Sequence, residues 1–293
     1  MIITNKYNLP EAFMLALKAH DDEYQGSRGE TDISATQLIK PPLVLQLYKQ
    51  KDGEIIEDIS DRIYSIFGSA VHKILEENTE TTGTAEQRLF MDCDGWKVSA
   101  QGDHLSKDGV LSDYKVTGVF KVQLGDYEEY EEQLNVLCYL YKEAGLAVEK
   151  LQIVALVRDW SIRKKRFARL RGQVYPDAPA VVIPIPMWTS EKTHLYIKER
   201  VALHKRYEGV ALEDIEECTP KEKWQSPSTY AVMKKGQKNA IRGGVCDTLA
   251  QAYKKLEEME KKSGEFYIEE RPEEEIRCVD YCHPEFCPYK KEK

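Results

Sequence analysis

Two aspartates and a lysine lie close together in one stretch of the sequence, on segments with strand patterns. Residues 110–116 (VLSDYKV) are predicted to form a strand, and because strand side chains alternate between faces, Asp113 and Lys115 share one face. The preceding residues 107–109 (KDG) have the composition of a hairpin turn that ends in glycine. Such a turn places Asp103 opposite Asp113 on the preceding strand. Facing carboxylates repel each other unless a cation lies between them, so the hairpin predicts half of a metal site with a lysine beside it.

The bulk composition is that of a globular protein. The chain has 293 residues, 42% hydrophobic and 31% charged, which is enough for one large domain or two modest ones. Its formal net charge of −8 excludes a uniformly basic nucleic-acid coat, although a local basic patch is compatible with it. Seven cysteines, an odd number, favour reduced thiols or metal ligands over a disulfide framework.

The sequence contains no pattern for export or membrane insertion. Pro10 and Glu11 interrupt the N-terminal region, which therefore does not resemble a secretory signal. No segment approaches the ~18 consecutive apolar residues of a membrane span. We therefore expect a cytoplasmic protein without a membrane partner.

The first part of the chain is predicted to be mainly helical. Residues 1–60 are interpreted as a structural lead-in, with Ser34 capping a helix that Pro41-Pro42 interrupts. Residues 61–78 are predicted to form an amphipathic helix with an apolar stripe of Ile63, Ile66, Phe67, Ala70, Val71, Ile74 and Leu75. Gly68 within it suggests a close approach by backbone or ligand. His72 and Glu76 share a face, but this histidine is an ordinary solvated or core residue unless its neighbours in the fold supply a site.

The middle of the chain alternates between strand and helix patterns. Residues 88–93 and 96–105 are predicted strands that form an antiparallel meander with 110–116, and Cys93 is interpreted as an ordinary strand cysteine. Residues 126–145 are predicted to form a helix capped by Asp126 and ended by Gly145. Its core-facing residues are predicted to be Leu134, Leu137, Cys138 and Tyr141. Polar groups also lie near that face, on Tyr130, Gln133 and either Tyr139 or Tyr141. They either need partners, such as a nucleic-acid backbone or a metal-bound water, or face solvent.

A basic segment follows the next predicted strand. Residues 151–157 (LQIVALV) form a continuous apolar run, as expected of a buried strand covered by helices on both sides and reached by a crossover from 110–116. Residues 158–171 then carry seven cations and Asp159, a net charge of +6; the cations are Arg158, Arg163, Lys164, Lys165, Arg166, Arg169 and Arg171. Such a concentration suits phosphates, although charge runs are commonly just solvated faces. Residues 180–186 are predicted to form an edge strand, and 190–208 a helix.

The C-terminal region carries a second candidate metal site. Cys278, Cys282 and Cys287 lie within ten residues, which is a strong metal-ligand pattern. The candidates for a fourth ligand are Cys218, Cys246 and His283. We favour Cys218 because Thr219-Pro220 gives it a loop-like setting, whereas packing of an amphipathic helix explains Cys246.

Four motifs in order resemble the PD-(D/E)XK nuclease superfamily, in particular its RecB-like exonuclease branch and nucleases encoded by bacteriophages. They are Gly68-x3-His72, Asp103, Asp113-Tyr114-Lys115, and a helix carrying Gln133 followed by tyrosines. The similarity covers about residues 60–160 by motif, and LSDYKVT, RDWS and the cysteine-rich tail resemble the phage group more closely. It implies an α/β, restriction-endonuclease-like core with a central mixed β-sheet flanked by helices. The expected organisation is a helical lead-in at 1–60, the nuclease core at 61–208 and a Cys-cluster region at 209–293 packed on that core, all in one composite domain.

The resemblance also implies roles for individual residues. Mg²⁺ or Mn²⁺ would be bound by His72, Asp103, Asp113 and the backbone carbonyl of Tyr114, with Glu76 binding through water. Lys115 would position or polarise the attacking water. DNA would be held by Gln133 with Tyr130 or Tyr139, and by Arg158, Arg163, Lys164, Lys165 and Arg166. The family often has its tyrosine four residues after the glutamine, where this chain has Leu137, so Tyr130, Tyr139 or Tyr141 must substitute.

Several RecB-like nucleases hold an iron–sulfur cluster with one remote and three C-terminal cysteines, commonly spaced x2 then x5. Here the spacing is x3 then x4, and the remote cysteine follows the nuclease motifs instead of preceding them. We expect a [4Fe–4S] cluster, with structural Zn²⁺ as the alternative, held by Cys218, Cys278, Cys282 and Cys287. Either group would attach the tail to the nuclease body and stabilise it.

The expected function is a Mg²⁺- or Mn²⁺-dependent DNA exonuclease in phage recombination, replication or DNA degradation. The alternatives are a structure-selective or nicking endonuclease of the same fold and, from another class, a non-catalytic DNA-binding or assembly module. The presence of all four residues His72, Asp103, Asp113 and Lys115 favours an active nuclease over a module without activity. The expected partners are DNA and, as candidates, a phage recombinase or a single-strand-binding protein, in the cytoplasm of a bacterial host.

Overall fold

The computed structural model describes residues 1–27, 29–79, 82–260 and 264–290. Two compact units make up the chain, Met1–Gly209 and Val210–Lys293, and each is described by itself. In the described part of the chain, no helix is long and apolar enough to cross a membrane.

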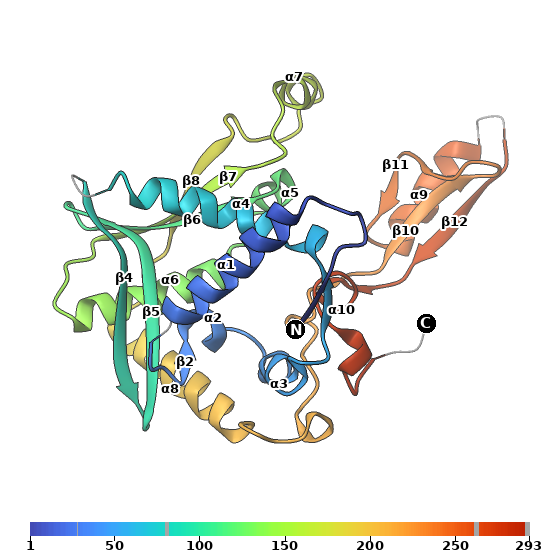
Figure 1. Cartoon of the computed structure of the whole chain (residues 1–293). Helices are drawn as coiled ribbons and strands as arrows, with labels where there is room; N and C mark the ends of the chain where they lie inside the picture. The colour runs from blue at the N-terminus through green and yellow to red at the C-terminus, as the bar shows by residue number, and fades with distance from the viewer. Residues whose placement is uncertain (28, 80–81, 261–263, 291–293) are drawn as a thin grey trace. The chain divides into compact units, whose positions relative to one another are not determined.

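The first unit is a mixed α/β structure with a central mixed sheet flanked by helices, which confirms the expected fold class at this level (Figure 1). Its strands are β1 (Ile2–Thr4), β2 (Ile33–Ser34), β3 (Ile56–Asp58), β4 (Gly83–Cys93), β5 (Trp96–Ser106), β6 (Val110–Thr117), β7 (Lys150–Val157) and β8 (Ala180–Ile185). Its helices are α1 (Glu11–Ser27), α2 (Ala35–Leu38), α3 (Pro42–Lys51), α4 (Ile59–Glu76), α5 (Val119–Leu124), α6 (Glu128–Glu143), α7 (Ile162–Leu170) and α8 (Ser190–Arg206).

The sheet has the order β2-β5-β6-β7-β8, with β4 also paired to β5. The predicted meander is confirmed, because β4, β5 and β6 are successive antiparallel neighbours. The predicted crossover is also confirmed, because β6 and β7 are parallel and α5 and α6 connect them. Strand β8 pairs antiparallel with β7 and closes the edge of the sheet, where its prolines are tolerated.

Helix α6 supplies the side chains that fill the core over the sheet. All four residues predicted to face the core are buried, namely Leu134, Leu137, Cys138 and Tyr141, and they pack with sheet residues that include Val98, Leu111 and Ile153. The close packing needs a glycine on β5, since a Cβ atom at Gly102 would lie 2.7 Å from the Tyr141 hydroxyl oxygen. Cys93 is buried in the same cluster, as its interpretation as a strand cysteine predicted.

Several local predictions were wrong. Ile59 is the buried residue of α4, whereas its predicted apolar stripe is only partly covered, with Phe67 49% and Ile74 61% exposed. A Cβ atom at Gly68 would have nothing within 4 Å among the described residues, so a close approach by backbone is wrong there, whereas Gly68 does line a pocket in which the predicted approach by a ligand stays a prediction. Helix α6 begins at Glu128 with Tyr127 at its N-cap, although the Asp126 carboxylate still accepts a hydrogen bond from Glu128 N at 3.3 Å.

Two further differences concern strand β7 and the first sixty residues. Strand β7 is not evenly buried, because its residues alternate between buried and half-buried, which leaves one face less covered than the apolar run predicted. The first sixty residues combine α1, α2 and α3 with short strands, of which β2 joins the central sheet. Ser34 does cap α2, with a full capping box to Gln37.

The second unit contains a three-stranded antiparallel sheet. Its order is β11-β10-β12, formed by β10 (Thr229–Lys234), β11 (Ala240–Cys246) and β12 (Phe266–Arg271), and helix α9 (Leu249–Glu260) lies against it. A second pair joins β9 (Gln225–Ser226) to β13 (Glu274–Glu275), followed by α10 (Ile276–Asp280). Cys246 ends β11 instead of beginning a helix. Lys223 connects this region internally, with its ammonium 2.6 Å from Glu217 and 3.0 Å from Glu275.

A buried histidine in the first unit predicts loss of stability in acid. His204 is 1% exposed, and burial lowers its pKa to about 4. Its Nε2 lies 3.0 Å from Leu38 O, and Nδ1 is buried without a hydrogen-bond partner among the described residues. Protonation therefore favours the unfolded state, so this stability is complete above about pH 6.5 and is lost as the pH falls through 4.

We expect His204→Gln to reduce the acid sensitivity of the fold. The wild type should lose about 3 kcal/mol of unfolding free energy from this group between pH 7 and 4, and the variant should not, because glutamine does not titrate. Urea unfolding at several pH values measures the difference, with the exposed His194→Gln as control. An unchanged pH dependence in His204→Gln would contradict the assignment.

Candidate functional site

The β5–β6 hairpin has the predicted turn and register. His104 pairs with Ser112 and Leu105 with Leu111, so the same register brings Asp103 opposite Asp113. Gly109 has φ +80°, the left-handed conformation that the turn requires. Both carboxylates are buried, Asp103 at 9% and Asp113 at 4% exposure. The hairpin therefore brings two acids together in a place where their charges need compensation.

His72 reaches this hairpin from α4. Its Nε2 lies 2.9 Å from the Tyr114 carbonyl oxygen, and its Nδ1 lies 3.4 Å from Asp103 Oδ1. The other oxygen of Asp103 accepts a hydrogen bond from Tyr114 N at 2.5 Å. The structure thus places His72, Asp103 and the Tyr114 carbonyl, three of the predicted ligands, in mutual contact.

Asp113 and Lys115 form a close pair on β6. Lys115 Nζ lies 2.6 Å from Asp113 Oδ2, although this buried oxygen makes no hydrogen bond of good geometry within the part of the chain that the structure describes. Burial raises the pKa of Asp113 to about 6, with Asp103 reinforcing the shift and Lys115 opposing it. Burial would lower the pKa of Lys115, but the two carboxylates outweigh it and raise that pKa above its usual range. Asp113 is therefore a carboxylate with unused capacity for a cation.

The chemical types of these ligand atoms suit a divalent cation, but their present arrangement does not. Carboxylate and carbonyl oxygens with one imidazole are the ligands that Mg²⁺ and Mn²⁺ accept. No group of three or more His, Cys, Asp or Glu side chains within the described ranges is arranged to hold a metal ion as it stands. The reason lies in the contacts above, since His72 faces Tyr114 O and Asp113 faces Lys115. Metal binding would exchange those contacts for contacts with the ion.

These residues line one pocket of about 930 Å³ in the first unit. It brings together four of the predicted side chains with Glu76 and Gln133; the four are His72, Asp103, Asp113 and Lys115. Gln133 Nε2 donates to Thr36 Oγ1 at 3.4 Å. The pocket is also lined by four residues that were not predicted as site residues, namely Ser34, Thr36, Arg88 and Gln101. Arg88 and Gln101 are paired across β4 and β5, so opposed polar residues on adjacent strands were the available indication.

Of the candidate tyrosines, Tyr130 lies nearest the catalytic lysine candidate. Lys115 Nζ is 5.8 Å and Lys121 Nζ 5.3 Å from the centre of the Tyr130 ring. The hydroxyl of Tyr139 instead lies 3.0 Å from His194 Nδ1, and Tyr139 does not line the pocket. Tyr141 is fully buried and donates to Gln87 O at 3.1 Å. Among these tyrosines, Tyr130 is thus the one whose ring lies near Lys115, although Tyr130 does not line the pocket.

The basic segment forms α7, which lies outside this pocket. Arg158 precedes the helix, with its guanidinium 4.0 Å from the centre of the Tyr64 ring on α4. Lys165 pairs with Asp177 at 2.9 Å and also donates to the Asp177 carbonyl. Helix α7 follows the end of β7 (Figure 1), and none of its residues lines the carboxylate pocket.

Cys218 lies in the second unit with the three C-terminal cysteines, although no group of three or more His, Cys, Asp or Glu among the described residues is arranged there to hold a metal ion. All seven cysteines of the chain are free thiols. Burial raises the pKa of Cys218 to about 12, and Glu222 and the three neighbours Cys282, Cys287 and Cys278 add to the shift. Burial also raises the pKa of Cys278 and of Cys282. The preferred fourth cysteine is thus close enough to the trio to feel its charge.

No protein-family model and no curated protein sequence matches the chain. Among solved structures, the crystal structure of SSO0001 is similar with a TM-score of 0.45 and 16% sequence identity, over 65% of this chain and 85% of that one. A protein from Eubacterium rectale named "Putative exonuclease" is similar with a TM-score of 0.32 and 12% identity, over 69% of each chain. Both TM-scores are low, so neither likeness assigns a function to this chain.

Proposed function

We propose that this protein is a divalent-metal-dependent deoxyribonuclease of the PD-(D/E)XK type that degrades linear DNA from its ends. The observation that carries the proposal is the meeting of His72, Asp103, Asp113 and Lys115 in one pocket, from two strands and a helix. The antiparallel meander, followed by the α6 crossover to parallel β7, supplies the strand and helix order that such a core needs.

The chemistry of the site suits phosphodiester hydrolysis. Bound Mg²⁺ or Mn²⁺ would supply an activated water and neutralise charge on the phosphate, held by His72, Asp103, Asp113 and the Tyr114 carbonyl. Lys115 has a raised pKa and stays protonated, so it donates a hydrogen bond and positive charge to the reacting phosphate or to the attacking water. Gln133 and Glu76 line the pocket, where Gln133 would position the strand, and the ring centre of Tyr130 lies 5.8 Å from Lys115 Nζ.

A comparison of linear and closed circular DNA tests the proposal. Linear duplexes labelled at one end should release short products in Mg²⁺ or Mn²⁺ and stay intact without added divalent metal. Closed circles should survive. Cleavage of circles at the rate of linear DNA would favour the endonuclease alternative, whereas binding of DNA without hydrolysis of either substrate would favour a non-catalytic module.

We further propose that Cys218, Cys278, Cys282 and Cys287 hold a thiolate-bound [4Fe–4S] cluster or Zn²⁺ in the second unit. The supporting observation is that Cys218 lies in the electrostatic neighbourhood of the other three. Thiolates favour both groups, and their binding would stabilise a region whose sheet has only three strands.

The freshly purified protein should contain iron or zinc. We expect Cys218→Ser to lower the metal content and the melting temperature of the protein, because one of four ligands is lost. Cys246→Ser is the matched control, since Cys246 ends β11 and belongs to no proposed ligand set. Elemental analysis decides between the two metals, and visible absorption would accompany iron–sulfur. Protein that was never exposed to chelator and contains neither element would contradict the site.

A further inference from the structure

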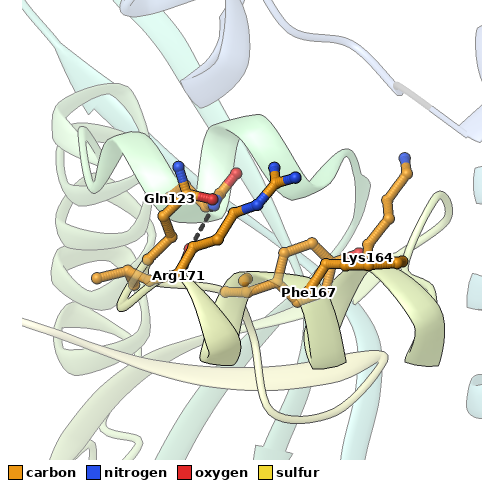
Figure 2. Close-up of a pocket in the computed structure, with 8 residues that line it drawn as sticks. Gln123, Lys164, Phe167 and Arg171 are labelled. Carbon is orange, nitrogen blue, oxygen red and sulfur yellow. Dashed lines mark hydrogen bonds between the residues drawn. The ribbon is translucent and has the colours of Figure 1, made fainter. Parts of the chain in front are cut away.

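A second pocket lies between α5, α7 and the loop that follows α7. It has a volume of about 640 Å³, within the range of small-molecule and nucleotide sites. Its lining combines the apolar side chains of Phe167, Ala168 and Val174 with the polar or cationic side chains of Gln123, Lys164 and Arg171. Gln123 Nε2 donates to Val174 O at 2.5 Å and so joins α5 to the loop. Figure 2 shows Lys164 and Arg171 extending from α7 on either side of Phe167.

The ring of Phe167 is available for stacking. Its side chain is 46% exposed, although it lines a pocket. Arg163 and Arg171, one turn before and one turn after it, hold their guanidinium carbons 5.7 and 5.9 Å from the ring centre. An aromatic face between two cations is suited to a base with phosphates on both sides, because stacking tolerates every base and the cations neutralise the backbone.

The positive charge of residues 158–171 also favours a ligand that carries phosphates. Residues 158–171 carry a net charge of +6 in a chain of net charge −8. Asp159, the one acid among them, accepts a hydrogen bond from Val119 N at 2.7 Å and so holds the start of α5. The cations of α7 are therefore concentrated around an exposed aromatic ring and not balanced by acids of their own segment.

A short path of contacts connects this pocket to the carboxylate site. Gln123 lines the pocket from α5, and Lys121 on the same helix lies 5.3 Å from the Tyr130 ring centre. The centre of the same Tyr130 ring lies 5.8 Å from Lys115 Nζ. Both sites are in the first unit, and β6 leads from Lys115 directly to α5.

We propose that this pocket binds one unpaired nucleotide of a DNA strand, with its base stacked on Phe167 and its phosphates on Lys164 and Arg171. The inference rests on the proposed function for its choice of DNA, and it assigns α7 to a single strand that enters or leaves the hydrolytic site. A single-strand ligand also accounts for the combination of apolar and cationic side chains, because a duplex backbone alone would need no stacking surface.

The test measures binding of fluorescein-labelled oligodeoxythymidylate by anisotropy, without added Mg²⁺ or Mn²⁺ so that no hydrolysis is needed. Phe167→Ala should weaken binding about tenfold, as the loss of one stacked base predicts, and Phe167→Tyr should bind like the wild type. Phe90→Ala is the matched control, because Phe90 is 47% exposed but lies on β4. Arg171→Gln should weaken binding and lower its salt dependence, whereas exposed Arg206→Gln should do neither.

Unchanged binding in Phe167→Ala would overturn the inference. The inference would also be overturned if an acidic peptide displaced the oligonucleotide equally well from the wild type and from Phe167→Ala. That result would indicate a site that binds anionic polymers without stacking. The measurement is independent of hydrolysis. If wild type binds through Phe167 but hydrolyses no DNA, the proposed function fails and the pocket assignment stands. If it hydrolyses DNA and Phe167→Ala binds normally, the pocket assignment fails alone.

Discussion

Asp113→Asn is expected to abolish metal-dependent hydrolysis of linear DNA while the protein stays folded. Asp113 is 4% exposed and its Oδ2 lies 2.6 Å from Lys115 Nζ; an amide at this position keeps the shape of the side chain but removes the negative charge that would hold the metal ion. The ion that it would hold supplies several kcal/mol of charge stabilisation in the transition state, so we expect a loss of at least about a thousandfold.

End-labelled DNA in Mn²⁺, followed over time, measures this loss, and circular dichroism checks the fold. Asp92→Asn is the matched control, because Asp92 is an exposed aspartate on β4, a strand of the same sheet. Calorimetric titration with Mn²⁺ should show weaker metal binding in Asp113→Asn and unchanged binding in the control. Hydrolysis at the wild-type rate in folded Asp113→Asn would exclude this site as the source of activity.

Lys115→Met is expected to lower the hydrolysis rate by about a hundred- to a thousandfold while metal binding persists. Methionine keeps the apolar stem of the side chain but removes the donor and the charge that would act on the developing phosphate, and such a loss typically costs this much in kcat. Because the ammonium lies 2.6 Å from Asp113 Oδ2, its removal also takes a competing cation away from the proposed ligand. Mn²⁺ should therefore bind as tightly as in the wild type, or more tightly.

The separation between rate and metal affinity is the specific readout for Lys115. Lys107→Met, at the exposed turn of the same hairpin, should change neither quantity. If higher Mn²⁺ concentrations restored the full rate of Lys115→Met, the lysine would act through metal binding and not on the phosphate. A folded variant with an unchanged rate would remove Lys115 from the mechanism altogether.

The local pattern of the chain was sufficient for the elements that carry the acids. The alternation in 110–116 and the glycine-ended turn before it predicted the β5–β6 hairpin and its register, which the pairing of Leu105 with Leu111 confirms. The amphipathic spacing in 126–145 predicted which side of α6 is buried. Both succeed because strand alternation and helical period are local properties, decided within a few residues of each position.

The same local reasoning failed where burial depends on distant partners. The apolar stripe of α4 predicts a covered helix face, but Phe67 and Ile74 remain largely exposed. Ser34, Arg88 and Gln101 line the carboxylate pocket, but their own segments do not show that they face the two aspartates. Which polar residues gather at a site depends on strand order and helix placement, and these are not local.

The sequence by itself therefore determined the chemistry that is available: two facing aspartates, a lysine on the same strand face, a cysteine trio and a basic segment. Only the tertiary structure decided how these groups are combined. It brought His72 within 3.4 Å of Asp103 from a helix, chose Tyr130 over Tyr139 as the neighbour of Lys115, and placed Cys218 near the C-terminal thiols. It also formed the Phe167 pocket by packing α5 against the loop after α7. The physical reason is that spacing along the chain fixes faces within one element, whereas contacts between elements depend on the packing of the whole core.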